Sequence, residues 1–222
     1  MKTHSRRSLL ALAGISALGT VSVSASPLRV GLPVRPLYSC GAVTGTPEIV
    51  HVDSDIPFEK AYIDTTIPYH ESVLKLVELN KDDLEDERLI EIADAILEQH
   101  PKDIEELKSY REDWFGSAET DEPTEEMMLL SMGGLESCSN ESHLDYLDVE
   151  WVEKTWEKND DHLFAFVSMM VLAMEMEHHQ HMVGLQLAEH EELKDFCQRM
   201  HETAEPQIKT LKTVRGELIN RY

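Results

Sequence analysis

Histidine and methionine side chains gather in one short stretch of this sequence, Met169 to Leu187. The stretch reads MMVLAMEMEHHQHMVGLQL and holds five of the ten methionines and three of the eleven histidines. Met174, His178 and Met182 are spaced by four residues, so on a helix they share one face. Thioether and imidazole groups together are the ligands of a soft or borderline metal, above all copper. The pattern therefore predicts either a copper site or a buried helix in which methionine fills gaps.

The other polar residues of the stretch add candidate ligands. His178 and His181 lie on the apolar stripe of the expected helix, so their ring nitrogens need partners when they are buried. His179 lies toward the flank of the helix, four residues after Glu175. A metal ion, or a carboxylate on a facing helix, would meet the need of the buried rings.

An enzyme with two metals is the rival interpretation. Glu175 and His178 form an E-x-x-H sequence, which is the ligand spacing of di-iron carboxylate bundles. Such sites require a second E-x-x-H on a facing helix, and the predicted helices contain none. We therefore expect a binding protein with no catalytic residues rather than an oxidase or ferroxidase. A metal-free helical module that meets a partner through its acidic faces is the third alternative.

Charge and cysteine content narrow the function further. The formal net charge is −23, which argues against nucleic-acid binding because phosphate contacts need clustered Lys and Arg. The three cysteines, Cys40, Cys138 and Cys197, show no C-x-x-C spacing, and the sequence cannot decide whether any two of them pair.

The first 25 residues have the pattern of a twin-arginine signal peptide. Arg6 and Arg7 precede an apolar run, and small residues up to Ala25 fit a cleavage site. The run is too short and too rich in Gly and Ser to predict a membrane span. We therefore expect a periplasmic or extracellular protein with no stable membrane insertion after cleavage. Residues 26–55, rich in Pro and Gly, predict an extended leader.

The rest of the chain predicts an all-α protein. Apolar residues recur at helical spacing, and strand patterns are almost absent. We expect a first helical hairpin at 56–116, a linker with short helices at 117–157 and a second hairpin at 158–222. Pro68 falls within the first stripe, so a kink or a late helix start is expected there. The two hairpins have a similar order of helices, which indicates an internal repeat and a four-helix bundle.

Two motifs resemble a known family. The first is Phe58-x-x-x-Tyr62-Ile63-Asp64-x-x-Ile67-Pro68-x-His70-Glu71, and the second is Met174-x-x-x-His178-His179-Gln180. With Trp114-x-Gly116 and Met132-Gly133-Gly134, they resemble a ferritin-like, exported family catalogued as domain of unknown function 305. The resemblance covers about residues 56–215.

The resemblance implies an extracytoplasmic bundle that binds a metal ion, because some members of the family are linked to copper binding and copper tolerance. Carried over by position, the implied ligands are His70, His178, His179, Met174 and Met182. The first half has Tyr69 where the family usually has histidine, so its site around His70 is expected to be weak or absent.

These observations predict copper sequestration, delivery or tolerance, with iron and zinc as alternative metals. Whether the protein forms a homo-oligomer or passes its metal to a partner stays open. The candidate metal ligands are those of both arguments together: His178, His179, Met174, His70, His181, Met182 and Glu175.

Overall fold

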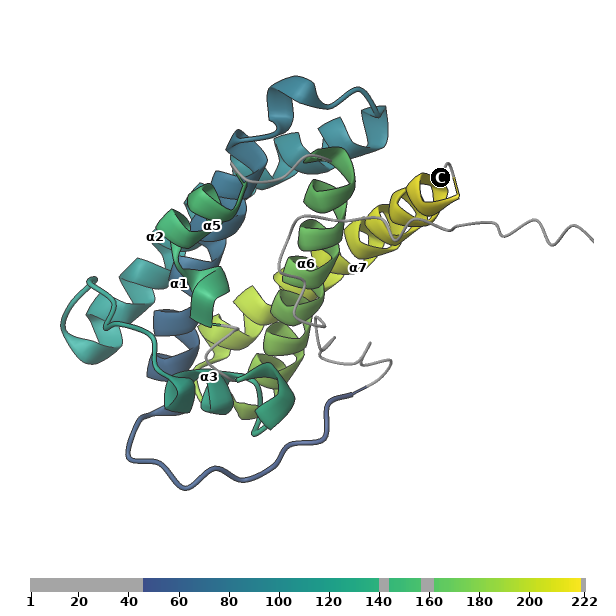
Figure 1. Cartoon of the computed structure of the whole chain (residues 1–222). Coiled ribbons are helices and arrows are strands. Elements are labelled where there is room, and N and C mark those ends of the chain that lie inside the picture. Colours follow the sequence, from purple (N-terminus) through teal and green to yellow (C-terminus); the bar gives the residue numbers. More distant parts are fainter. Residues whose placement is uncertain (1–45, 140–143, 157–161, 221–222) are drawn as a thin grey trace, which may run out of the picture.

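Four long helices dominate the protein. The computed structural model describes residues 46–139, 144–156 and 162–220, and the regular structure within these ranges is entirely helical. The long helices are α1 (Phe58–Glu78), α2 (Glu87–Phe115), α6 (His162–Leu187) and α7 (Glu191–Ile219) (Figure 1). The expected all-α class is confirmed. The predicted signal peptide and most of the predicted leader lie outside the described residues, and the remainder of the leader, before α1, carries no helix.

Short helices connect the two long pairs. A 3-10 turn, η1 (Lys81–Asp83), lies between α1 and α2. The segment before α6 contains α3 (Glu125–Ser131), η2 (Glu136–Cys138), η3 (Asp145–Leu147) and α5 (Val149–Trp156). Both α3 and α5 pack on α1. In the described part of the chain, no helix is long and apolar enough to cross a membrane.

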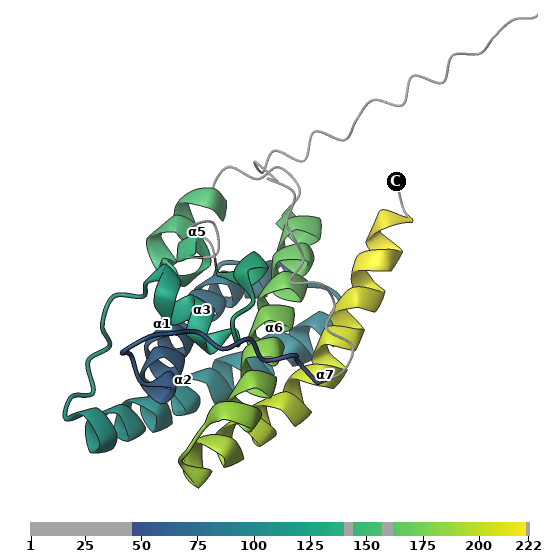
Figure 2. The same ribbon diagram turned by 90° about the horizontal axis from the view of Figure 1, so that it is seen from below.

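The helices of each long pair lie against one another. α6 and α7 make the most extensive contact in the fold, and they run side by side in both views (Figures 1 and 2). Gly184 of α6 allows α7 to pack closely against α6, because a Cβ atom there would collide with the sulfur of Cys197. α1 packs on α2 and also on α6, so it joins the two pairs.

Polar groups fix the ends of the helices. The Asp86 side chain accepts a hydrogen bond of 3.0 Å from the Arg88 backbone N–H, and Gly116 ends α2 with a positive φ of 82°. The start of α7 is held by a side chain of another helix. Glu59 of α1 accepts hydrogen bonds of 2.8 Å from the backbone N–H groups of Glu189 and His190. The start of α7 is therefore tied to the start of α1.

Proline does not interrupt the long helices. Pro68, Pro101 and Pro206 lie inside α1, α2 and α7, each of which continues through it. The late helix start considered at Pro68 is wrong, because α1 begins ten residues earlier at Phe58. Each proline removes one backbone hydrogen bond, and tertiary packing of the buried helix faces offsets that loss.

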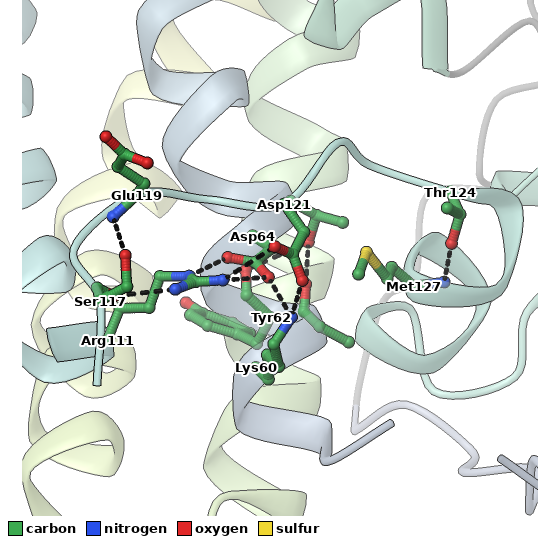
Figure 3. Close-up of polar contacts among 11 residues, drawn as sticks. Lys60, Tyr62, Asp64, Arg111, Ser117, Glu119, Asp121, Thr124 and Met127 are labelled. Carbon is green, nitrogen blue, oxygen red and sulfur yellow. Dashed lines mark hydrogen bonds and ion pairs between the residues drawn. The ribbon is translucent and has the colours of Figure 1, made fainter. Parts of the chain in front are cut away.

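A buried ion pair joins α1 to the end of α2 (Figure 3). Arg111 donates from Nε and Nη2 to the two carboxylate oxygens of Asp64, at 2.5 and 3.2 Å. Arg111 also donates to the carbonyl of Ser117 at 2.8 Å, and Lys60 pairs with both Asp64 and Asp121. The network therefore holds the α1–α2 hairpin together with the segment that follows α2.

The hydrophobic core has two parts with polar residues between them. Along α1, Ile67 belongs to one apolar cluster and Val73 to the other, and His70 falls between them. Along α2, Ile96 and Ile104 belong to different clusters, and the buried residues between them are polar, His100 and Asp103. The helices therefore bring a polar layer into the middle of the molecule.

Candidate metal centre

The polar layer is completed by α6. Its central turns are apolar and buried on most faces, as expected for a helix in the middle of a bundle. Glu177 and His181 nevertheless point inward, with exposed fractions of 2% and 0%. A buried carboxylate is costly unless it is paired, so the partners of Glu177 decide what this region can do.

Three histidines from three helices surround Glu177. His70 Nε2 of α1 is in direct contact with Glu177 Oε1. The Nε2 atoms of His100 on α2 and His181 on α6 lie 3.9 and 3.8 Å from the same oxygen. The rings of His70 and His100 are stacked, with their centroids 4.3 Å apart. All three histidines are almost completely buried.

Asp103 adds a second buried carboxylate. It lies one turn after His100 on α2, and its Oδ1 accepts a hydrogen bond of 2.9 Å from Gln99. Arg199 of α7 approaches the same oxygen at 3.8 Å. Ligand atoms of His70, His100 and Asp103 lie within 4.8 Å of one another.

The charge states of the residues in this cluster favour binding of a cation. Burial lowers the pKa of His100 to about 3, with a further contribution from His70, and burial also lowers the pKa of His181. Both rings are therefore neutral near pH 7, which leaves a nitrogen lone pair on each. Burial opposes ionisation of Glu177, but the neighbouring histidines, His70 above all, hold its pKa well below the ordinary value. Glu177 is therefore a buried anion.

A tyrosine orients one of the histidines. The Tyr62 hydroxyl lies 2.6 Å from His181 Nδ1, and the Cys197 thiol donates to the same hydroxyl at 3.3 Å. A partner on Nδ1 fixes the orientation of the ring and turns Nε2 toward Glu177. Burial raises the pKa of Tyr62 well above its ordinary value, so the phenol stays neutral.

A pocket of about 280 Å³ leads toward the cluster. It lies between α2, α6 and α7, and its wall includes His100 and Glu177 together with the thioethers of Met174 and Met200. Exposed residues such as Glu98 also line it. The pocket is therefore lined both by two members of the buried cluster and by residues at the surface.

Comparison with protein families agrees with the sequence motifs. The family described as "Domain of unknown function (DUF305)" matches residues 59–215, more than half of the chain. The chain belongs to this family. No curated protein and no solved structure matches it.

The structure places the predicted ligands of this DUF305 protein in different environments. His70 and His181 belong to the buried cluster, and Met174 lies beside it in the pocket wall. The expectation of a weak or absent site around His70 stays a prediction, and in the structure His70 lies in a cluster that draws residues from both halves of the chain.

The remaining predicted ligands lie elsewhere. His178 is half-buried and stacks on His201 of α7, with ring centroids 4.6 Å apart. His179 lies 3.2 Å from the Met132 carbonyl through Nε2, and Glu175 pairs with Lys212 at 2.5 Å. Met182 is partly buried on α6.

Three residues of the cluster were missed by sequence reasoning. His100, Asp103 and Glu177 are not among the candidate ligands that the sequence motifs indicate. Their spacing contained a signal: Glu177 and His181 are four residues apart, and His100 and Asp103 are three apart, so each pair shares a helix face. What the spacing could not provide is the packing of α1, α2 and α6 that brings the pairs together.

Proposed function

We propose that this DUF305 protein binds one divalent transition-metal ion, preferably copper, in the buried cluster and sequesters or delivers it outside the cytoplasm. One observation carries the proposal: three buried imidazoles and two buried carboxylates face one another without completing their hydrogen bonds. Among the described residues, the atoms without a hydrogen-bond partner include His70 Nδ1, both ring nitrogens of His100, His181 Nε2 and Asp103 Oδ2.

His70 contacts Glu177 directly, whereas the spacing of the other two histidines leaves room for an ion. His100 and His181 approach Glu177 Oε1 at 3.9 and 3.8 Å, which is too long for a hydrogen bond. Ligands bound at about 2 Å to one ion lie up to about 4 Å apart. A buried polar layer that served structure alone would be expected to satisfy its own donors and acceptors.

The donor types favour copper. Imidazole suits copper, zinc, iron and nickel, and among divalent ions copper binds most tightly to a given set of nitrogen and oxygen ligands. Burial raises the pKa of Asp103, but once ionised the two carboxylates balance the charge of a divalent ion, so the cluster suits Cu(II) better than Cu(I). The Met174 and Met200 thioethers in the pocket suit Cu(I). Copper is the metal for which both sets of ligands are favourable.

Storage or delivery accounts for these features better than the two rivals. A carboxylate-bridged oxidase would need more acidic ligands than Glu177 and Asp103, the two carboxylates that the described part of the cluster provides. A metal-free interaction module would have no use for unpaired imidazoles in its interior. A location outside the cytoplasm is supported by the signal-peptide pattern of residues 1–25.

The test is a titration of the purified chain with Cu(II), Zn(II) and Fe(II), followed by calorimetry and visible absorption. We expect one copper ion per chain, bound more tightly than zinc or iron. Glu177→Gln and His181→Gln should each weaken binding at least tenfold. Glu175→Gln is the matched control, since it removes a carboxylate from the same helix that pairs with Lys212 outside the cluster.

The same titration distinguishes a metal site in the buried cluster from a metal site at the His178–His179 motif. If His178→Gln and His179→Gln abolish binding while Glu177→Gln and His181→Gln leave it intact, the ion binds at the motif and the proposed site is wrong. A wild-type chain that binds none of the three metals would contradict the proposed function as a whole. Anaerobic Fe(II) loading followed by oxygen would reveal the oxidase alternative through uptake of two irons per chain.

A further inference from the structure

A chain of hydrogen bonds runs from the candidate metal centre into the apolar core. The Tyr62 hydroxyl lies 2.6 Å from His181 Nδ1 and 3.3 Å from the Cys197 sulfur. The three residues come from α1, α6 and α7, and all three are completely buried. A Cβ atom at Gly184 would collide with the sulfur and would lie 3.2 Å from Tyr62 Cε2, so the glycine leaves the room that this chain needs.

The hydrogen bonds of this chain can run in two directions. A neutral imidazole carries one proton, on Nδ1 or on Nε2, and a phenol and a thiol carry one proton each. If His181 is protonated on Nε2, the Tyr62 hydroxyl donates to Nδ1 and accepts from the Cys197 thiol. If His181 is protonated on Nδ1, the ring donates to Tyr62, and the Tyr62 hydroxyl then needs an acceptor of its own.

A metal ion on His181 requires the second direction. Nδ1 is engaged by Tyr62, whereas Nε2 faces Glu177 at 3.8 Å and has no hydrogen-bond partner among the described residues. Nε2 is therefore the nitrogen that is free to bind an ion, and it can do so only without its proton. The exchange keeps the number of protons constant, since Nε2 loses one and Nδ1 gains one while the hydroxyl and the thiol rotate.

Two side chains could accept the Tyr62 proton in that state. The Thr66 hydroxyl lies within reach of the phenol, but it belongs to the same helix and donates to the Tyr62 carbonyl at 2.7 Å. The Cys197 sulfur comes from α7, on the other side of the phenol from α1. Of the two, the sulfur is the one that is hydrogen-bonded to the hydroxyl in the described part of the chain.

We propose that Cys197 is a positioning residue of the metal centre, because its sulfur accepts the Tyr62 proton and so stabilises the tautomer of His181 that binds metal. This inference rests on the proposed function and adds to the site a residue that does not touch the ion. A thiol sulfur is a weak acceptor, so Cys197 contributes less than Tyr62 does. A buried hydroxyl with no acceptor would nevertheless cost free energy.

Nuclear magnetic resonance tests the tautomer of His181 directly. The full chain is labelled with 15N-histidine, and His181→Gln identifies the His181 signals of the metal-free chain, which are then followed through a titration with Zn(II). Zn(II) is the probe because it is diamagnetic. We expect the ring proton on Nε2 before zinc is added and on Nδ1 in the zinc-loaded chain. A zinc-loaded chain in which Nδ1 of His181 carries no proton would overturn the proposal.

Affinity measurements test the sulfur. In competition with a chromophoric chelator, Cys197→Ala should bind Cu(II) about five- to tenfold more weakly, since the Tyr62 hydroxyl loses its acceptor. Cys197→Ser should stay within about twofold of the wild type, because its hydroxyl also accepts. Leu193→Ala is the matched control. It truncates another completely buried residue one turn earlier on α7, so it should lower stability and leave the affinity unchanged.

The variants also distinguish positioning from packing. Equal losses of affinity in Cys197→Ala and Cys197→Ser, or in Cys197→Ala and Leu193→Ala, would show a packing effect and overturn the proposal. A loss in Thr66→Val with unchanged affinity in Cys197→Ala would place the acceptor at Thr66 and overturn it as well. A wild-type chain that binds neither Cu(II) nor Zn(II) would instead contradict the proposed function itself.

Discussion

Tyr62 acts on the candidate metal centre through a single hydrogen bond. Its hydroxyl lies 2.6 Å from His181 Nδ1, so the ring of His181 is held with Nε2 toward Glu177. Partners on the second nitrogen of a metal-binding histidine fix its tautomer and orientation. Tyr62 is therefore a positioning residue for a ligand and, at 0% exposure, also a part of the core.

Replacing Tyr62 by phenylalanine separates these two roles. We expect Tyr62→Phe to weaken copper binding about 10–100-fold, because His181 loses the partner of Nδ1. The apolar volume is nearly unchanged, so the helical circular dichroism should be unchanged. Competition with a chromophoric chelator measures the affinity. Tyr69→Phe is the matched control, since Tyr69 is also buried but donates to the Ala173 carbonyl; an equal loss of affinity in both variants would contradict the positioning role.

Gly184 is required by the closeness of α6 and α7. A Cβ atom at this position would collide with the Cys197 sulfur and would also lie 3.2 Å from Tyr62 Cε2. We expect Gly184→Ala to lower the free energy of unfolding by about 1–3 kcal/mol through overpacking. Urea unfolding checks this value. Adding Cys197→Ala should restore part of the loss, and an additive double variant would show that the sulfur is not the obstacle.

Individual ligands could be predicted from the sequence only in part. His181 follows from its place on an apolar stripe, since a buried ring needs a partner, and His70 follows from the family motif. His178 and His179 have the same motif and neighbouring positions, yet one stacks on His201 and the other meets a backbone carbonyl. A helical wheel gives the face of each residue but not the identity of the helix opposite, which decides between a ligand and a structural histidine.

At the scale of the elements, a buried ion pair holds the α1–α2 hairpin. Asp64 and Arg111 are 0% and 4% exposed as side chains and are joined by two hydrogen bonds. Burial makes such a pair sensitive to the loss of one partner, because the other charge is left uncompensated. Exposed pairs such as Glu98 with Lys102 contribute little in comparison.

Removal of one member of this pair should destabilise the protein strongly. We expect Asp64→Ala to lower the free energy of unfolding by about 3–5 kcal/mol, since Arg111 would be buried without its main partner. Urea unfolding followed by circular dichroism measures the change. The double variant Asp64→Leu with Arg111→Met should be much less affected, and Glu98→Gln should lie within about 1 kcal/mol of the wild type. A loss below 1 kcal/mol in Asp64→Ala would show that the pair is not important.

The helices themselves were the most predictable feature of the chain. Apolar stripes located the four long helices because a buried face must repeat every three or four residues. Proline was a weaker guide, since α1 continues through Pro68. Propensity describes an isolated helix, and here the contacts of α1 with α2, α3 and α6 outweigh the one hydrogen bond that Pro68 removes.

For the whole molecule, the polar layer is a stability cost placed between two apolar clusters. Neutral buried histidines and a buried anion do not add hydrophobic free energy, and the unpaired nitrogens lose their hydration. A bound ion would reverse this cost by stabilising the folded state alone. The layer should therefore make the metal-free protein sensitive to conditions that change the charge of its histidines.

Low pH should reveal how much stability the polar layer costs. Burial lowers the pKa of His100 from an ordinary value of 6.5 to about 3. Between these values the unfolded chain binds a proton at this residue and the folded chain does not, so the free energy of unfolding falls as the pH falls. His181, with a pKa also lowered by burial, acts in the same direction. Below about 4.5, protonation of Glu177 in the unfolded chain adds to the loss, because its pKa in the folded protein is also lowered.

We expect the metal-free wild type to lose several kcal/mol of unfolding free energy between pH 7 and pH 4.5, as measured by urea unfolding at intervals of half a pH unit. The net charge of −23 acts in the opposite direction, since partial protonation of the acidic surface relieves repulsion. The comparison is therefore with His100→Gln, which has the same surface and lacks the buried ring that resists protonation. Its unfolding free energy should change less steeply with pH, and the difference between the two curves isolates His100. Parallel curves for the two proteins would show that the pKa of His100 is not lowered in the folded state, and the burial argument for this ring would then be wrong.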